Sequence, residues 1–388
     1  MLIAALALAC IAPSPPGGVG PSLVLGTQTF SPGYRFTRED GLVETARGIL
    51  AMGSDILKIT LANDYKRQYP GIADRPDLRT VRELAEKHPS YRKVLAMPFR
   101  HIMLWVYPMR AGWWDKGLSA EDAGRTYHEM YDLAAYLLRQ FSGSDKTFLL
   151  GHWEGDWHLH PDYDPTKDPS DVMIRGMTDW LRVRQRAVED ARRDTPHRRV
   201  RIFHYTEVNL VQKAMRGGRT ITNDILPTVN PDFVSYSSYD SLIGEGETLR
   251  NNLRRALDYI ESKLPPRPEI AGRRVFIGEF GFPAAGHPPD RQARLARNVF
   301  QVALEWGCPY ALYWQYHCNE VDRDGRRRGF WLVDDKGVKQ PVYHLLAGYL
   351  REARKLERRL RRQQGNAFTA DAFRREALRV LPAAPAAP

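Results

Sequence analysis

The chain has 388 residues, 43% of them hydrophobic, so it is long enough to bury a large core. Its formal net charge is +11, but the arginines fall mainly in helical stretches, and no basic segment has the spacing of a zinc finger, a helix-turn-helix or an RNP motif. Composition therefore argues against nucleic-acid binding, and beyond the N-terminal run no segment is long and apolar enough to span a membrane. We expect a solvated basic surface, with a preference for an anionic glycan as the alternative.

Residues 1–22 are predicted to be an export segment followed by a linker. The run MLIAALALAC is apolar and too short to span a bilayer, and the Pro/Gly-rich stretch IAPSPPGGVG follows it. This pattern is typical of the hydrophobic region of a secretory signal, although no Lys or Arg precedes it. Cys10 follows Ala7-Leu8-Ala9, an imperfect lipobox, so a lipid anchor at Cys10 is one form of the prediction. We therefore expect a periplasmic, extracellular or surface-anchored protein.

Eight short runs rich in β-branched and aromatic residues follow, and most of them precede a longer stretch with apolar residues at helical spacing. The predicted strands are residues 23–30, 56–61, 102–107, 147–154, 200–207, 232–239, 274–280 and 310–317. The clearest helical stretches between them are EDGLVETARGILAMG, AEDAGRTYHEMYDLAAYLLRQF, ETLRNNLRRALDYIESKL and DRQARLARNVFQVALEWG. Eight such units predict a (β/α)8 barrel, the TIM-barrel fold, formed as a single domain by residues 23–352.

An open, doubly wound sheet is the alternative to a closed barrel, but no turn of the G-x-G-x-x-G type follows the first strand. The helix after the fifth strand is the weakest element, because MRGGRTITNDILPTV is short and broken. Residues 353–388 are predicted to form a basic helical extension and a disordered Pro/Ala-rich tail. Cys308 and Cys318 lie at opposite ends of the eighth strand, too far apart for a disulfide, so we expect two free thiols in a monomeric protein.

The catalytic groups of such barrels come from the C-terminal ends of the strands and from the loops that follow them. Two carboxylates stand at such ends: Glu154 in LLGHWEGDW closes the fourth strand, and Glu279 in RVFIGEFGFP closes the seventh. Three strand–helix units separate them, so we expect their side chains to face each other across the mouth of the barrel. Lys58, in the middle of the second strand, is predicted to be an interior charge paired with a carboxylate.

Cleavage of a glycosidic bond requires two facing carboxyl groups. One carboxylic acid protonates the leaving oxygen, and in a retaining enzyme the other carboxylate attacks the anomeric carbon. A gap of ~5–5.5 Å between the two groups gives retention, and a gap of ~6.5–9.5 Å gives inversion. The acid needs a raised pKa, which a nearby negative charge or the flanking Trp153 and Trp157 can supply.

The segment I-G-E-F-G-F-P around Glu279 resembles the nucleophile strand of the clan A retaining glycoside hydrolases, which include cellulases, mannanases and β-galactosidases. The resemblance implies that Glu279 is the nucleophile and Glu154 the acid/base of a poly- or oligosaccharide hydrolase that needs no cofactor. It also implies that a Tyr after the sixth strand, Tyr236 or Tyr239 in VSYSSYD, bonds to the nucleophile. By the same resemblance, Trp314 in ALYWQYH floors the sugar site at the scissile bond.

One position departs from the clan pattern. The clan has Asn immediately before the acid/base, where it contacts the sugar 2-hydroxyl, whereas this chain has Trp153 there and His152 before it. Either His152 or another loop residue then binds the 2-hydroxyl, or the acid/base is Glu207 in HYTEVN at the end of the fifth strand. The same departure keeps open a second class of function, a glycan-binding barrel that has lost its chemistry.

The remaining candidates for substrate contact are Asp156, just after the fourth strand, and the adjacent Trp113 and Trp114 in the loop after the third. We expect at least one of the two tryptophans to stack on a sugar ring. Histidines near Asp156 also suggest a metal site, but metal-dependent barrel hydrolases usually carry an H-x-H motif on the first strand, and LVLGTQTF has none. We therefore expect no metal, with a metal-dependent hydrolase as the less favoured alternative.

Overall fold

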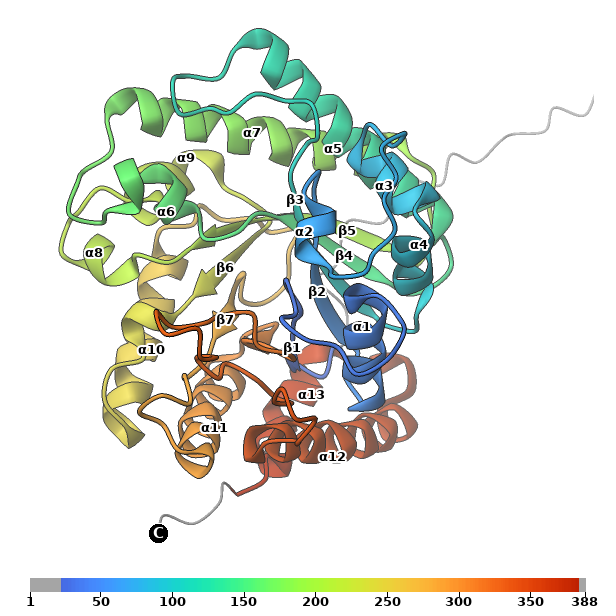
Figure 1. Ribbon diagram of the computed structural model, residues 1–388, viewed down its shortest axis with the longest axis vertical. Helices are drawn as coiled ribbons and strands as arrows, with labels where there is room; N and C mark the ends of the chain where they lie inside the picture. Colours follow the sequence, from blue (N-terminus) through green and yellow to red (C-terminus); the bar gives the residue numbers. More distant parts are fainter. Residues whose placement is uncertain (1–21, 384–388) are drawn as a thin grey trace, which may run out of the picture.

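The computed structural model describes residues 22–383 and shows a barrel of eight parallel strands enclosed by helices (Figure 1). Neighbouring strands pair in the order β1-β8-β7-β6-β5-β4-β3-β2. The N–H of Thr29 donates to the carbonyl of Lys58 (3.1 Å), which links the two ends of the sheet. The predicted single-domain (β/α)8 barrel is thus confirmed. The strands are β1 (Leu25–Thr27), β2 (Ile56–Leu61), β3 (His101–Val106), β4 (Thr147–Gly151), β5 (Arg201–Val208), β6 (Phe233–Ser237), β7 (Val275–Phe280) and β8 (Ala311–Tyr313).

Helices form the outer layer, and several begin at a side chain that caps them. Ser119 accepts the backbone N–H of Asp122 at the start of one long helix, and Ser170 accepts that of Met173 at the start of another. The helices are α1 (Gly41–Ala51), α2 (Tyr65–Gln68), α3 (Val81–Lys87), α4 (Pro89–Ala96), α5 (Ala120–Gln140), α6 (Gly155–Leu159), α7 (Asp171–Asp194), α8 (Val211–Met215), α9 (Leu226–Val229), α10 (Gly246–Ser262), α11 (Pro289–Trp306), α12 (Pro341–Gln364) and α13 (Ala370–Ala377). The segment after β5 is broken, as predicted, into α8, a π-helical turn and α9.

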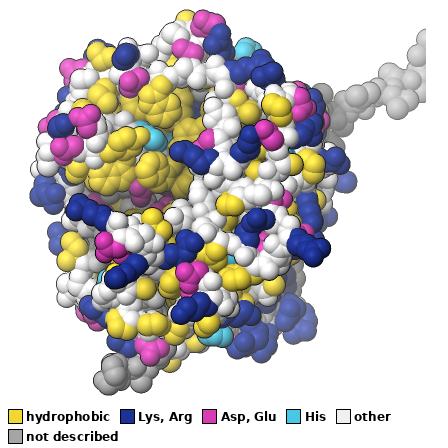
Figure 2. Space-filling model, viewed as in Figure 1, with side chains coloured by type: hydrophobic (Ala, Val, Ile, Leu, Met, Phe, Trp, Pro, Cys, Tyr) yellow, Lys and Arg dark blue, Asp and Glu magenta, His cyan; other side chains and the backbone are white. Residues whose placement is uncertain are grey.

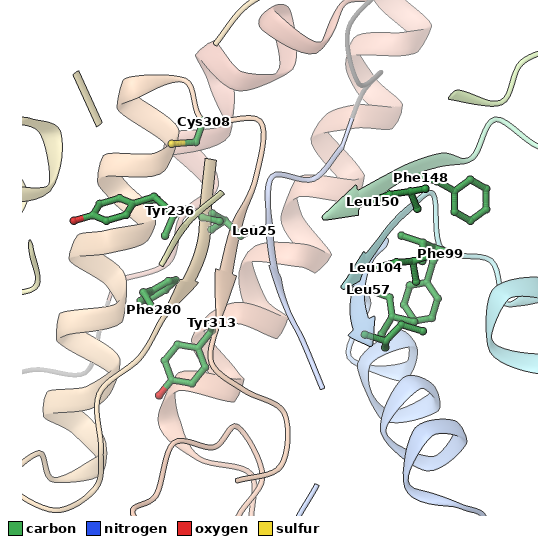
Figure 3. Packing of buried hydrophobic residues seen from close by; sticks show 14 of the residues in the cluster. Leu25, Leu57, Phe99, Leu104, Phe148, Leu150, Tyr236, Phe280, Cys308 and Tyr313 are labelled. Carbon is green, nitrogen blue, oxygen red and sulfur yellow. The ribbon is translucent and has the colours of Figure 1, made fainter. Parts of the chain in front are cut away.

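Alternation along the strands divides the buried side chains between two cores. Leu57, Leu104 and Leu150 pack in the outer core, between the sheet and the helices (Figure 3). Their neighbours Met103 and Leu149 belong to an inner cluster that contains no helix residue. The inward face of each strand therefore fills the barrel, and its last inward positions open onto the mouth where the site lies.

The C-terminal segment differs from the sequence prediction. The predicted boundary at residue 352 falls inside α12, and α13 folds back so that Phe373 and Ala377 are buried in the outer core. As far as residue 383, this segment is therefore part of the outer layer rather than a solvated extension. The Pro/Ala-rich end and the predicted export segment with Cys10 lie in residues 384–388 and 1–21, outside the described residues, and stay predictions.

Two further sequence predictions concern the chain as a whole. Cys308 and Cys318 are both buried and free, as expected from their separation along the eighth strand. Among residues 22–383, no helix combines the length and the apolar character that crossing a bilayer requires.

Candidate active site

Glu154 lies three residues beyond the end of β4, at the residue that precedes the first turn of α6. Its carboxyl group is buried, and the hydroxyl of Ser237 on β6 donates to its Oε1. Burial raises the pKa of Glu154 to about 8, and the neighbouring Glu207 adds to the rise. The hydrogen bond from Ser237 and the charge of Lys58 oppose that rise in pKa. A carboxylic acid that keeps its proton at neutral pH is suited to general acid catalysis.

Glu279 faces the same space because β7 is irregular near its end. Phe276 points into the barrel and Ile277 outward, so strict alternation would turn Glu279 toward the helices. The register of β7 shifts against both β6 and β8 around Gly278, and Phe280 consequently belongs to the outer core. The irregularity re-aims Glu279 toward the mouth.

The two oxygens of Glu279 have different surroundings. Tyr239 donates its hydroxyl to Oε1 (3.1 Å), whereas Oε2 is buried without a hydrogen-bond partner among the described residues. Burial raises the pKa of Glu279 well above its usual value, and the nearby Glu154 and Glu207 raise it further. A free, desolvated carboxylate oxygen is poised either to attack carbon or to accept a hydrogen bond from a ligand.

Ser237 brings the two carboxyl groups into one site. It pairs with Glu279 across β6 and β7, and its hydroxyl bonds to Glu154. The pKa of each glutamate is raised by burial, and the charge of Glu154 raises that of Glu279. Two carboxyl groups in one buried site do not ionise independently, because a charge on one raises the pKa of the other.

Below this pair lies a fully buried ion pair. Lys58 Nζ on β2 is 2.8 Å from Glu207 Oε2 on β5, and Ser235 on β6 donates its hydroxyl to the same oxygen (2.6 Å). The predicted pairing of Lys58 with a carboxylate is thus confirmed. Glu207 Oε1 accepts the backbone N–H of Glu154 (3.0 Å). Every polar atom of Glu207 therefore has a protein partner, which leaves no free oxygen for a substrate.

An aromatic cavity of about 460 Å³ lies at the mouth, lined by residues of β2 and β3, of the segments that follow β2, β3 and β4, and of α7. Trp153, immediately before Glu154, lines it, and the exposed Trp113 forms part of its wall. Figure 2 shows it as a hollow bordered by hydrophobic side chains with a histidine at its centre. The cavity is also lined by Tyr107, His158, Tyr163 and Trp180, and on one side by Asn63, Asp64, Arg67 and Gln68. Its volume is typical of a small-molecule binding site.

A stack of three rings connects this cavity with the eighth strand. Trp105 lines the cavity and packs on Phe30 with ring centroids 3.7 Å apart, and Phe30 in turn stacks on Trp314 (5.6 Å). The indole N–H of Trp314 donates to Glu320 Oε1 (2.9 Å), which fixes the orientation of the ring. Trp314 directly follows β8, and its role as the floor of the sugar site stays a prediction.

Two other predicted contact residues, Trp114 and Tyr236, are fully buried. Trp114 is 0% exposed against 42% for its neighbour Trp113, so only Trp113 can reach a ligand. Tyr236 points outward and bonds to Asp240, which leaves Tyr239 as the tyrosine on Glu279 (Figure 3). Neither Trp114 nor Tyr236 therefore presents its ring to the site in this structure.

The side chains of Asp156 and His152, two polar candidates for substrate contact, accept hydrogen bonds from backbone N–H groups. Asp156 accepts the N–H groups of Asn209, Leu210 and Ile221, at 2.8–3.1 Å, and ties α6 to the loop after β5. His152 Nε2 accepts the N–H of Glu207 (3.3 Å), and burial lowers the pKa of His152 to about 3. Neither residue faces the cavity. Among the described residues, no group of three or more His, Cys, Asp or Glu side chains is arranged to hold a metal ion.

Gly278→Ala is expected to destabilise the fold by about 1–3 kcal/mol. A Cβ on Gly278 would lie 1.7 Å from Ser235 Oγ, so Ser235 must move and release Glu207. Thermal unfolding measures the loss, with Gly124→Ala in α5 as the control because a Cβ there meets nothing within 4 Å. Adding Ser235→Ala should restore part of the stability; an unchanged loss would place the conflict in the strand itself.

No family model matches the sequence, and neither does any curated protein. Solved structures do match. One is a variant of a glycoside hydrolase of family 5, subfamily 18, from Streptomyces cattleya in complex with Manβ1-4GlcNAc, with a TM-score of 0.57 and 16% identity over 85% of this chain and 81% of that chain. The fold is that of the barrel glycoside hydrolases.

Two further structures support that assignment. A variant of the same subfamily from Bifidobacterium longum subsp. longum gives a TM-score of 0.56 and 15% identity over 85% of this chain and 78% of that one. β-Glucuronidase 2 of Bacteroides uniformis gives 0.52 and 11% over 86% of this chain, which spans 35% of that larger protein. The family 5 structures belong to clan A, the group that the segment around Glu279 resembles.

Proposed function

We propose that the protein is a retaining glycoside hydrolase in which Glu279 is the nucleophile and Glu154 the acid/base. The observation that carries the proposal is the pair of buried carboxyl groups of Glu154 and Glu279 at the mouth of the barrel, where the charge of Glu154 raises the pKa of Glu279. The architecture common to this chain and the barrel glycoside hydrolases supports it. Tyr239 would hold Oε1 of Glu279 while Oε2 reacts.

The proposed reaction has two steps. In the first, Glu279 Oε2 forms a bond to the anomeric carbon while the bond to the glycosidic oxygen breaks, and Glu154 transfers its proton to that oxygen. In the second, Glu154, now a carboxylate, takes a proton from water, whose oxygen displaces Glu279 from the same carbon. Two inversions at one carbon give net retention, and the proton taken from water leaves Glu154 protonated for the next cycle.

The substrate we propose is an oligo- or polysaccharide that occupies the aromatic cavity and the surface of Trp314. Aromatic faces cover the apolar faces of sugar rings, and the polar side chains on one wall, Asn63 and Arg67 among them, are placed to bond hydroxyl groups. A carboxylated glycan remains a candidate because of the net charge of +11.

A panel assay tests the proposed function. Neutral and anionic polysaccharides and β-linked disaccharides are incubated with the full chain, and new reducing ends are counted. The anomeric configuration of the first product is read by proton NMR before it equilibrates. Cleavage with retained configuration supports the proposal, and an inverted product refutes the retaining mechanism. Binding without cleavage across the panel would favour the glycan-binding barrel, to which the Trp153 departure points.

Trp113→Ala is expected to raise KM by about tenfold and to leave kcat within a few-fold, because the ring lines the cavity and touches no reacting group. Trp113→Phe should recover most of the loss, since a smaller aromatic face remains. Trp306→Ala on α11 is the control, because Trp306 is half-buried and does not line the cavity. Equal KM values for Trp113→Ala and wild type would exclude this wall from the substrate site.

A further inference from the structure

The buried pair of Lys58 and Glu207 contacts the backbone of Glu154 and of the residue that precedes Glu279. Glu207 Oε1 accepts the N–H of Glu154 itself (3.0 Å), and Lys58 Nζ donates to the carbonyl of Gly278 (3.1 Å), the residue before Glu279. Lys58 and Glu207 lie 2.8 Å apart, and neither is exposed. One ion pair therefore links β2, β5 and β7 with the segment that follows β4.

We propose that Lys58 and Glu207 are positioning residues that hold Glu154 and Glu279 at a fixed separation and set the charge around them. The inference rests on the proposed function of those two glutamates. It gives Glu207 a role different from acid/base catalysis, because both of its oxygens are engaged by Lys58, Ser235 and the Glu154 backbone.

A buried ion pair costs desolvation energy that apolar side chains of similar size would avoid. The inner core offers such an alternative, since Met, Leu and Phe fill neighbouring inward positions. Lys58 is also held over the Trp105 ring, with Nζ 4.6 Å from its centroid, so its charge has a second partner at the wall of the cavity. The ion pair is therefore expected to contribute less to stability than apolar side chains would. Its hydrogen bonds to Glu154 and Gly278 are directed to the candidate site.

The groups that act on the carboxyl pair come from β2, β5 and β6, from α6 and from the turn after β6. Glu154 is affected by Ser237, Glu207, Lys58 and Trp157, and Glu279 by Glu154, Lys58, Glu207 and Tyr239. Lys58 is the cation in both sets and lowers the pKa of both glutamates, whereas Glu207 raises both. Removing one member of the ion pair therefore leaves a net charge of known sign beside the reacting groups.

Three variants separate charge from position. Glu207→Gln retains an oxygen that can accept the Glu154 N–H but leaves Lys58 unneutralised, so both limbs of the kcat/KM–pH profile should move down by roughly 1 pH unit. Lys58→Met leaves three carboxyl groups with no cation, and both limbs should move up. In the double variant, which has neither charge, the limbs should return toward wild type while kcat stays reduced, because the link to Gly278 is lost.

The two-way shift is the result that a purely structural pair would not give. If Glu207→Gln and Lys58→Met move the limbs in the same direction, or leave them in place while only the thermal midpoint falls, the proposal is wrong. If a single variant fails to fold, the double variant still decides, because it carries no lone buried charge. A double variant with wild-type kcat and profile overturns the positioning role.

The test also separates this proposal from the proposed function. If wild type cleaves nothing on the panel, the function fails, and the carboxyl titrations of Glu154 and Glu279 are followed instead by ¹³C NMR on glutamate-labelled protein. Signals are assigned by their loss in Glu154→Gln and Glu279→Gln. Opposite displacement of those titrations in Glu207→Gln and Lys58→Met supports the ion-pair role without any substrate, and unchanged titrations refute it.

Discussion

Glu279→Gln is expected to lower kcat/KM by roughly 10⁴-fold or more, with little change in the thermal midpoint. The amide has the size of the carboxyl group and can accept the hydrogen bond of Tyr239, but it cannot form a stable bond to the anomeric carbon. Reducing-end release from the substrate found in the panel measures the loss. Glu305→Gln is the matched control, because Glu305 lies on α11 and pairs with Arg254 instead of facing Glu154.

A smaller side chain at this position gives a chemical check on the role. In Glu279→Ala, added azide can enter the vacated space and form the bond to the anomeric carbon, while Glu154 still protonates the leaving oxygen. One displacement then replaces two, so the glycosyl azide should have the inverted configuration. An azide product of retained configuration, or wild-type rates without azide, would remove Glu279 from the role of nucleophile.

Much of the fold could be predicted because it depends on local pattern. β-Branched runs alternate with helical stretches eight times, and a barrel is the arrangement in which each strand of such a chain finds two neighbours. The end of the chain was harder, since the burial of Phe373 depends on how α13 packs against helices distant in sequence. The many basic residues of α12 and α13 make this segment polar on average, so its composition did not indicate that Phe373 and Ala377 would be buried.

Only some of the residues in the candidate site could be placed from the sequence. Alternation on β6 was available to exclude Tyr236, because Val234 and Tyr236 face the helices while Ser235 bonds inside the barrel. The same reasoning finds Ser237, which the motif search missed. The orientation of Glu279 has no such signal, since it depends on a register shift at Gly278 that only the packed sheet reveals. The aromatic cavity was missed in part because its walls combine the segments after β2, β3 and β4 with Trp180 of α7.

Glu154→Ala is expected to lower kcat/KM by about 10²–10⁴-fold on glycosides whose leaving alcohol must be protonated. A 2,4-dinitrophenyl glycoside releases a stable anion that needs no proton, so formation of the glycosyl-enzyme from it should stay close to the wild-type rate. Pre-steady-state release of dinitrophenolate measures that step. Hydrolysis of the intermediate becomes slow because no carboxylate remains to activate water, and azide should accelerate turnover and give a product of retained configuration.

The dependence on the leaving group also decides between Glu154 and Glu207. Both oxygens of Glu207 are bonded to protein groups, so Glu207→Gln should slow the dinitrophenyl glycoside and the natural glycoside by similar factors. If Glu207→Gln instead spares the dinitrophenyl glycoside and Glu154→Ala slows both, the acid/base is Glu207. The ion pair with Lys58 would then have to open during turnover. Both the assignment of Glu154 as acid/base and the positioning role of Glu207 would be wrong.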